Sequence, residues 1–375
     1  MYITILYTIL LIVAIYIISL LIYILGSIIS KTTLPLKELP PVSIIVAVKN
    51  GENTLPKLLN DLKNQTYKEP CEFIIVDDQS TDSTKNIIKT IEQKNKQFRY
   101  ASSINGDKKL FLKKRALDAG IKIAKYEHLI FTDVDCKLKP TWVESMANCF
   151  SQNIDYIIGY SEISNPSNPI SWFQKIDLLM MMIAGRATCN LNIPFACTGQ
   201  NQAYKKYLYK KIGFLNIKSI QGDDTLFMQL CLKEKIKIIF NDDKKSFVES
   251  RIETNAMSFI KQRIRWAADA KMIWTYNKGY FLIFLSTFVT NLLLLLGPII
   301  LLINHNFMQC LYVIFLIKFV LELIIYIVGS IKLKTKKNLL IFICWYIIEI
   351  PYVVFMGIGS FFIKYIGWKG QKVTD

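Results

Sequence analysis

Two pairs of aspartates have the residue type and spacing to hold a metal ion or to move a proton. FTDVD places Asp133 and Asp135 one residue apart at the end of an apolar run, and QGDD places Asp223 and Asp224 next to each other before an amphipathic stretch. A hard cation such as Mg²⁺ or Mn²⁺ is typically held by one or two carboxylates together with substrate phosphates. Either pair alone is also explained by a polar strand end or a helix cap, so the elements around them must decide.

Two further clusters carry polar side chains that could serve the same chemistry. VDDQSTD provides Asp77 and Asp78 at the end of a second apolar run, a pattern that a turn and a helix cap also produce. QRIRW provides Gln262, Arg265 and Trp266 ahead of a long apolar segment, where a helix lying at membrane headgroups would also place them. The order of all four clusters is more informative than any one of them.

The composition excludes several classes of protein. Of the 375 residues, 52% are hydrophobic, yet the formal net charge is +17, which fits a membrane protein with basic cytoplasmic edges. The lysines are spread along the chain and border apolar runs, so nucleic acid is not an expected partner. His128 and His305 are the only histidines, which argues against triad hydrolysis, and the eight cysteines show no zinc-like spacing.

Four apolar segments are long enough to cross a membrane. Residues 1–30 contain no charged side chain and lack the basic start and the cleavage site of a signal peptide, so we expect a permanent N-terminal anchor. Three further segments, at 279–303, 307–330 and 339–363, make a C-terminal membrane region over 279–363. Lys318 and Glu322 stand four residues apart in it, so we expect them to pair.

The basic flanks of these segments predict their orientation. Lys31 and Lys37 place the region 31–278 in the cytoplasm, at an inner or plasma membrane. A fully spanning segment at 339–363 would leave the basic tail, residues 364–375, on the opposite side. We therefore expect this segment to break at EIPY and to return as a re-entrant hairpin.

The cytoplasmic region alternates like an α/β domain. PVSIIVAVKN, CEFIIVDDQS, EHLIFTDVD and DYIIGYSEI are short runs rich in β-branched residues, which predicts strands. TDSTKNIIKTIEQK carries apolar residues at helical spacing behind a capping signal, and the methionine-rich stretch SWFQKIDLLMMM predicts an interface helix. Strands separated by helices favour a mostly parallel sheet, whose ligands collect at the carboxyl ends of the strands.

Seven motifs occur in an order that resembles the membrane-bound family 2 glycosyltransferases, which have the GT-A fold and include cellulose, hyaluronan and ceramide-glucosyl synthases. The motifs are PVSIIVAVKNGE, FIIVDDQSTDST, LKKRALDAGI, FTDVDCKLKP, TGQNQAYKK, QGDDTLFMQL and QRIRW, and the resemblance covers residues 41–270. It implies a cytoplasmic GT-A domain with one N-terminal and several C-terminal transmembrane helices. Ala47, Asp118 and Asp223 depart mildly from the family, which usually has proline, asparagine and glutamate there.

The resemblance implies a donor site at the matched positions. The nucleotide would be contacted by Asn50, Glu52, Asp77, Asp78 and Lys113. Asp135, with Asp133, would hold the metal and the diphosphate. The diphosphate would also be covered by the three motif residues Gln262, Arg265 and Trp266.

The resemblance also implies a base and an acceptor loop. Asp224 matches the catalytic base of the family, and Asp223 before it leaves some choice about which carboxylate moves the proton. The loop residues Thr198, Gly199 and Gln200 would face the transferred sugar, and Trp266 would also lie at the acceptor.

The chemistry of these residue types agrees with the resemblance. Negative charge develops on the leaving diphosphate, where a divalent cation and the guanidinium of Arg265 can neutralise it. Asp224 can take the proton of the acceptor hydroxyl as its oxygen attacks the sugar, and a single displacement inverts the anomeric centre. We therefore expect an inverting, Mg²⁺- or Mn²⁺-dependent transferase that uses a nucleotide-diphosphate sugar, with UDP as the expected nucleotide.

The expected acceptor is associated with the membrane, because QRIRW stands just before the segment at 279–303. Few membrane segments and a short chain favour a ceramide- or diacylglycerol-like lipid, with a growing polysaccharide made by a processive synthase as the alternative. Two other classes are a non-catalytic membrane scaffold and a sugar nucleotidyltransferase. Loss of a key carboxylate would have favoured the scaffold, but all of them are present. A nucleotidyltransferase would need neither the membrane segments nor QRIRW.

Overall fold

The computed structural model describes residues 2–31, 36, 38–150, 154–219, 222–303 and 308–365. The chain divides into two compact units, each built from separate stretches of sequence. The sheet unit consists of Lys31–Asn165 and Asn192–Arg251, and the helical unit of Met1–Ser30, Pro166–Leu191 and Ile252–Asp375. The methionine-rich helix and the QRIRW motif therefore belong to the unit that also contains the predicted membrane segments.

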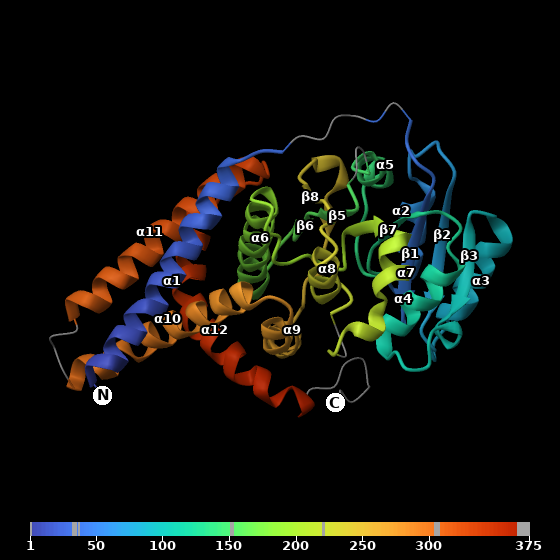
Figure 1. Ribbon diagram of the computed structural model, residues 1–375. Coiled ribbons are helices and arrows are strands. Elements are labelled where there is room, and N and C mark those ends of the chain that lie inside the picture. Colours follow the sequence, from blue (N-terminus) through green and yellow to red (C-terminus); the bar gives the residue numbers. More distant parts are fainter. Residues whose placement is uncertain are drawn as a thin grey trace. The chain divides into compact units, whose positions relative to one another are not determined.

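The sheet unit is built on a sheet whose described strands follow the order β3-β2-β1-β4-β7-β5-β8 (Figure 1). The strands are β1 (Val42–Val48), β2 (Cys71–Asp77), β3 (Phe98–Ser102), β4 (His128–Phe131), β5 (Tyr156–Gly159), β7 (Gln202–Lys205) and β8 (Ile238–Asn241). Neighbours pair in parallel except at β7, which is antiparallel to β4 and β5. A short parallel ribbon joins β6 (Ser161–Glu162) to β9 (Val248–Glu249). The mostly parallel sheet expected from the sequence is confirmed.

Helices connect these strands. They are α2 (Leu55–Lys63), α3 (Thr84–Lys94), α4 (Leu112–Ile123), α5 (Trp142–Asn148), α7 (Lys206–Ile212) and α8 (Thr225–Leu232), with short 3-10 turns at Ser103–Asn105, Phe214–Asn216 and Lys244–Ser246. Gly120 allows α4 to pack directly on the sheet, because a Cβ there would lie 2.7 Å from Ile45 Cγ2 and 2.9 Å from Val76 Cγ2. The apolar runs of β1 and β2 are buried almost throughout, as expected for parallel strands covered on both faces.

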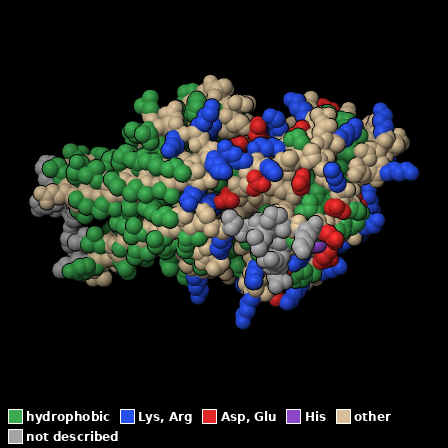
Figure 2. Space-filling view, turned by 90° about the horizontal axis from the view of Figure 1, so that it is seen from above, with side chains coloured by type: hydrophobic (Ala, Val, Ile, Leu, Met, Phe, Trp, Pro, Cys, Tyr) green, Lys and Arg blue, Asp and Glu red, His purple; other side chains and the backbone are tan. Residues whose placement is uncertain are grey.

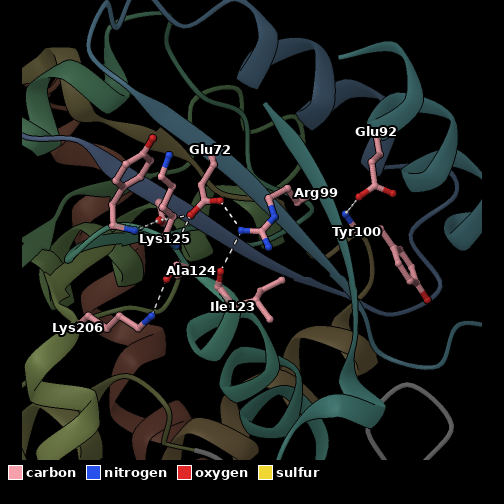
Figure 3. Close-up of polar contacts among 10 residues, drawn as sticks. Glu72, Glu92, Arg99, Tyr100, Ile123, Ala124, Lys125 and Lys206 are labelled. Carbon is pink, nitrogen blue, oxygen red and sulfur yellow. Dashed lines mark hydrogen bonds and ion pairs between the residues drawn. The ribbon is translucent and has the colours of Figure 1, made fainter. Parts of the chain in front are cut away.

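The amino-terminal edge of the sheet is held by a buried carboxylate (Figure 3). Glu72, at the start of β2, pairs with Arg99 of β3 at 2.7 Å and accepts the backbone N–H of Lys125 at 2.5 Å. The same carboxylate accepts the Ser43 hydroxyl of β1 at 2.6 Å, and Arg99 also donates to the carbonyl of Ile123 at 3.0 Å. The network joins β1, β2, β3 and the end of α4, so it fixes this edge and leaves the carboxyl edge free for chemistry.

The helical unit contains α1 (Tyr2–Ile28), α6 (Pro169–Asn190), α9 (Ala256–Tyr276), α10 (Lys278–Ile303), α11 (Met308–Lys332), α12 (Leu339–Gly359) and a 3-10 turn, Ser360–Tyr365. Within the described residues, four helices are long and apolar enough to cross a membrane: Tyr7–Ile28, Lys278–Leu302, Met308–Lys332 and Leu339–Phe362. On the face seen in Figure 2, hydrophobic side chains gather on the left part of the view with few charged side chains among them. The N-terminal and three C-terminal segments expected from the sequence are confirmed as helices of that kind.

The predicted break at EIPY is wrong. α12 runs without interruption through Pro351, and the candidate membrane span continues to Phe362. Proline is tolerated in apolar helices where neighbouring groups satisfy the freed backbone carbonyl. The basic tail led to this prediction, and from residue 366 onward it lies outside the described residues.

A charged cluster lies inside the helical unit. Lys318 of α11 pairs with Glu322 at 2.8 Å, as the four-residue spacing predicts, and with Glu349 of α12 at 2.7 Å. The hydroxyl of Tyr16, on α1, donates to Glu322 at 2.5 Å. The cluster therefore ties three of the apolar helices together.

Candidate active site

The carboxyl ends of β1, β2 and β4 form one edge of the sheet, because these strands are parallel neighbours. β7 runs the other way and pairs Gln202 with Phe131, so the residues just before β7 lie at the same edge as those just after β4. This places Asp133 and Asp135 beside the loop 198–200. The connections turn to opposite sides of β1 at this edge, the position at which open α/β sheets bind ligands.

Lys113 joins the two predicted acidic pairs. Its Nζ lies 2.9 Å from Oδ1 of Asp133 and 3.1 Å from Oδ2 of Asp223. Burial alone would lower the pKa of Lys113, but the carboxylates of Asp133, Asp223 and Asp224 outweigh it and raise that pKa well above its ordinary value. The side chains of Lys113 and Asp133 are 25% and 28% exposed, so this fixed positive charge can be reached from solvent.

The backbone that presents Lys113 is unusual. Leu112 opens α4 with φ +52°, a left-handed conformation that residues with a side chain rarely adopt. Such conformations concentrate at functional sites, where the surrounding structure imposes them.

Gly199 brings the acceptor loop against these charges. Its N–H donates to Oδ2 of Asp224 at 3.0 Å. A Cβ at this position would lie 2.9 Å from Lys113 Nζ, 3.4 Å from Asp223 Oδ2 and 3.5 Å from Asp224 Oδ2. A side chain at residue 199 would therefore displace the Lys113 ammonium group, whereas its contacts with the two aspartates would be ordinary ones.

The two neighbouring aspartates have different surroundings. Asp223 is buried, at 8% exposure, and forms an ion pair with Lys113. Asp224 is more exposed and caps α8, where its Oδ1 accepts the N–H of Thr225 at 2.5 Å. An acceptor hydroxyl can reach a carboxylate only where it is open, so this geometry favours Asp224 over Asp223 as the base.

Thr225 is a site residue that the sequence argument missed. Its hydroxyl donates to the carbonyl of Cys197 at 3.0 Å and accepts the N–H of Cys197 at 3.2 Å. These reciprocal bonds hold the start of the loop 198–200 against the helix that Asp224 caps. The sequence signal that could have identified Thr225 is a hydroxyl residue directly after the aspartate pair, in GDDT.

The residues after β4 alternate in exposure. Asp133 and Asp135 are partly exposed, whereas Val134 and Cys136 are buried. Burial, reinforced by the two carboxylates, raises the pKa of the Cys136 thiol well above its ordinary value, so that thiol stays protonated and packs in the core. Both carboxylates of FTDVD are therefore partly accessible to solvent.

A divalent metal fits this pair only together with ligand oxygens. Within the described part of the chain, no group of three or more His, Cys, Asp or Glu side chains could hold a metal alone. Mg²⁺ and Mn²⁺ bind nucleotides through one or two carboxylates plus phosphate oxygens, which is the donor set that Asp133 and Asp135 provide. Lys113 occupies Oδ1 of Asp133, so a metal bound at Asp133 would compete with this ion pair.

The loop after β1 is joined to the loop after β2. Asn50, at φ +50°, accepts the N–H of Thr81 on its Oδ1 at 2.9 Å. Glu52 accepts the N–H of Ser83 on its Oε2 at 3.2 Å. The two residues predicted to lie beside the nucleoside thus also shape the second loop.

The two aspartates at the end of β2 are both buried. Asp77 is 4% and Asp78 6% exposed. Oδ1 of Asp77 accepts the N–H of Ser80 at 3.0 Å, and the N–H of Asp78 donates to the carbonyl of Val48 at 2.7 Å. Asp77 therefore stabilises the turn that VDDQSTD also predicts. This turn lies at the end of β2, where the nucleotide is predicted to bind.

The QRIRW motif lies on α9 of the helical unit. Gln262 donates from Nε2 to Oε1 of Glu253 at 3.3 Å, Arg265 is partly exposed, and Trp266 is 40% exposed. The sheet unit thus brings together Lys113, Asp133, Asp223, Asp224 and Gly199, while the three motif residues form a separate group on one helix.

Comparison with known proteins identifies several relatives of this chain. Residues 43–213 match the family model described as glycosyl transferase family 2. The chain is 25% identical over 236 residues to the poly-beta-1,6-N-acetyl-D-glucosamine synthase of Staphylococcus epidermidis, which covers 62% of this chain and 55% of that protein. It is 26% identical over 254 residues to a probable glycosyltransferase of Sulfolobus acidocaldarius, covering 64% and 52%.

A shorter match is the glycosyltransferase EpsH of Bacillus subtilis, 32% identical over 125 residues, or 32% of this chain and 33% of that protein. The chain therefore spans between a third and about half of the length of these curated relatives. A mannosyltransferase of Pyrobaculum calidifontis, solved with GDP-mannose and Mn²⁺, shares the fold with a TM-score of 0.56 at 16% identity, covering 88% of this chain and 99% of that one.

The fold, the family match and the named relatives agree with the geometry at the carboxyl edge. Residues 43–213 of this chain are similar to glycosyl transferase family 2, and the sheet unit has the fold of a GT-A domain.

Proposed function

We propose that this protein is an inverting, metal-dependent transferase that moves a sugar from a nucleotide-diphosphate sugar, with UDP as the nucleotide, to a hydroxyl of a membrane-associated acceptor. The observation that carries the proposal is the cluster at the carboxyl edge. There Lys113 bridges Asp133 and Asp223, and Gly199 touches Asp224. A structural ion pair would need neither the third carboxylate nor the close loop.

The donor would lie along this edge with its parts assigned to different loops. The buried Asp77 and Asp78, with Asn50 and Glu52, would contact the nucleoside. Asp135, with Asp133, would hold Mg²⁺ or Mn²⁺ against the diphosphate, which neutralises charge on the leaving group. The neighbour solved with a nucleotide sugar and Mn²⁺ supports a donor of this class.

Asp224 would carry the proton transfer. As the acceptor oxygen attacks C1 of the sugar, its proton passes to the Asp224 carboxylate, and the bond between C1 and the diphosphate oxygen breaks. The nucleoside diphosphate leaves with that electron pair. Gly199 N–H, already bonded to Asp224 Oδ2 at 3.0 Å, would hold the carboxylate in the orientation that the attack needs.

Lys113 would set the charge of the site before the donor binds. Its ammonium group neutralises part of the repulsion among Asp133, Asp223 and Asp224, and in the loaded enzyme the same group can pair with a phosphate oxygen. Arg265, with Gln262 and Trp266, would bind the diphosphate and the acceptor, as the match of QRIRW to the family motif implies.

The acceptor we propose is a lipid of the ceramide or diacylglycerol kind, reached from the cytoplasmic face of an inner or plasma membrane. The four apolar helices support a membrane location, and Lys31 and the basic stretch KLKTKK support the sheet unit on the cytoplasmic side. A polysaccharide synthase is the second candidate, because the Staphylococcus epidermidis relative makes a polymer of N-acetylglucosamine.

The test uses the full chain purified in detergent, supplied with UDP-glucose, UDP-galactose, UDP-N-acetylglucosamine or GDP-mannose and with Mg²⁺ or Mn²⁺. Release of nucleoside diphosphate and incorporation of sugar into a lipid extract would be followed together. We expect one sugar per lipid with one donor and loss of turnover in Asp224→Asn. A long polymer would select the second candidate, and no turnover with any donor, or full turnover in Asp224→Asn, would overturn the proposal.

A further inference from the structure

Arg263 stands inside the QRIRW motif but has no assigned role. It lies on α9 between Gln262 and Arg265, and it is only 4% exposed. Its Nη2 pairs with Oδ2 of Asp177, on α6, at 2.9 Å. Unlike its neighbours in the motif, this arginine therefore points into the helical unit.

The Arg263 guanidinium lies over the ring of the motif tryptophan. The guanidinium carbon is 4.1 Å from the centre of the Trp266 ring and 5.0 Å from the centre of the Phe259 ring. A cation over an aromatic face is attracted to it, most strongly for tryptophan and for arginine that is removed from water. Arg263 therefore supports one face of the indole while 40% of the Trp266 residue remains exposed.

The carboxylate that anchors Arg263 is itself held in place. Asp177 is 7% exposed and also accepts the hydroxyl of Tyr352, on α12, at 3.4 Å. Tyr352 stacks on Phe259 with 5.9 Å between ring centres, and Phe173 meets both rings edge-on. The anchor joins α6, α9 and α12 at the depth of Arg263.

Holding helices together with this buried ion pair costs more free energy than apolar packing would. Nε and Nη1 of Arg263 are buried without a hydrogen-bond partner among the described residues. Replacing a buried ion pair with apolar side chains of similar size is often neutral or stabilising, so packing alone does not require the arginine. A planar cation that pairs with a carboxylate and supports an indole at once is needed only if the orientation of the indole matters.

We propose that Arg263, anchored on Asp177, is a positioning residue that holds the Trp266 indole in the orientation that receives the acceptor. The inference rests on the proposed function in one respect, namely that Trp266 contacts the acceptor. Arg263 itself touches neither donor nor acceptor. It acts through the tryptophan, so its loss should affect acceptor use and leave donor binding in place.

The experiment uses full-length protein in detergent labelled with 5-fluorotryptophan, with the Trp266 resonance assigned by Trp266→Phe. Three variants are compared: Arg263→Met, Arg263→Lys and, as a matched control, Lys261→Met at an exposed position of the same helix. We expect the Trp266 fluorine resonance to shift or broaden in both Arg263 variants and to stay unchanged in Lys261→Met. A lysine at this position keeps the positive charge, but it has no planar group that can both pair with Asp177 and stack on Trp266. Arg263→Lys should therefore change the resonance less than Arg263→Met.

The kinetic arm separates acceptor from donor. In Arg263→Met the acceptor KM should rise by about three- to tenfold, the range of a lost cation–π contact, with UDP binding by calorimetry unchanged. An unchanged Trp266 resonance in a folded Arg263→Met or Arg263→Lys protein would overturn the inference, and so would equal losses of donor and acceptor affinity. Because the fluorine resonance is read without turnover, it still tests the inference if the proposed acceptor chemistry fails.

Discussion

Each unit of this protein contains a lysine between two carboxylates, and the two clusters differ in everything except that pattern. In the sheet unit, Lys113 lies 2.9 Å from Asp133 and 3.1 Å from Asp223. In the helical unit, Lys318 lies 2.8 Å and 2.7 Å from two glutamates. Distances alone would make them equivalent.

Their surroundings separate them. The side chain of Lys113 is 25% exposed, at a sheet edge, against a glycine loop and a third carboxylate. The side chain of Lys318 is 1% exposed, between apolar helices, with an aromatic ring 4.4 Å from its Nζ. The open cluster can exchange its partners for a substrate, and the closed one can only hold helices together. A charged triad therefore indicates chemistry only where its members can be reached.

The largest effect is expected from the base. Asp224→Asn should lower kcat by about 10²–10⁴-fold, because the amide cannot take the acceptor proton, while the affinity for UDP stays within about twofold. Steady-state kinetics and calorimetry with UDP check this pair of outcomes. Asp223→Asn is the comparison variant, and a larger loss there than in Asp224→Asn would assign the proton to Asp223.

Removing the two lysines should separate stability from activity. Lys318→Met leaves Glu322 and Glu349 buried without a counter-charge, which should lower the free energy of unfolding by about 3–5 kcal/mol. Lys113→Met should lower it by about 1 kcal/mol or less, since that cluster is partly exposed, but should reduce kcat/KM about tenfold. Denaturant unfolding in detergent measures both, with the exposed Lys336→Met as control. Equal destabilisation by the two lysine variants would contradict the distinction between the exposed cluster at Lys113 and the buried cluster at Lys318.

Two glycines extend the same contrast. A Cβ at Gly26, on α1, would lie 2.2 Å from the carbonyl oxygen of Ala187, so Gly26→Ala should destabilise the helical unit by about 1–3 kcal/mol. At Gly199 the nearest atom is the mobile end of Lys113, 2.9 Å away. Gly199→Ala should therefore displace the ammonium group and lower turnover with little change in unfolding. A Gly199→Ala protein with normal turnover would show that the loop need not touch the lysine.

The smallest effect concerns pH. The pKa of Lys113 in the folded protein is raised above its ordinary value of 10.5, so its ion pairs contribute fully below pH 10.5 and are lost only as the pH rises through the folded pKa. The difference in unfolding free energy between wild type and Lys113→Met should therefore be flat from about pH 6 to 9. A difference that declines within this window would mean that Lys113 titrates near neutrality.

The sequence predicted the parts of the fold that are apolar and local. The runs that form β1 and β2 are buried almost throughout, and their β-branched residues made them recognisable. β3, β7 and β8 were not predicted. They are four or five residues long, and β3 and β7 include Arg99 and Gln202, so pairing with neighbours rather than composition makes them strands.

The candidate site was predicted as a set of residues and not as a set of contacts. FTDVD and GDD named the carboxylates, but nothing local could show that Lys113 pairs with residues 20 and 110 positions away. The break at Pro351 was wrong for a related reason, because the flanking charge outweighed the apolar length of a helix that continues to Gly359. The sequence of QRIRW also fits a helix lying at membrane headgroups, and nothing local in it shows that Arg263 is buried and pairs with Asp177 on α6.

The central claim is a single displacement at the carboxyl edge with Asp224 as the base. The most direct test is the anomeric configuration of the product, read from the proton coupling at C1 by NMR after transfer from an α-linked UDP-sugar. A β-linked product is the result that this account predicts. An α-linked product would contradict it, because retention requires a second displacement or a front-face attack instead of the single displacement proposed here.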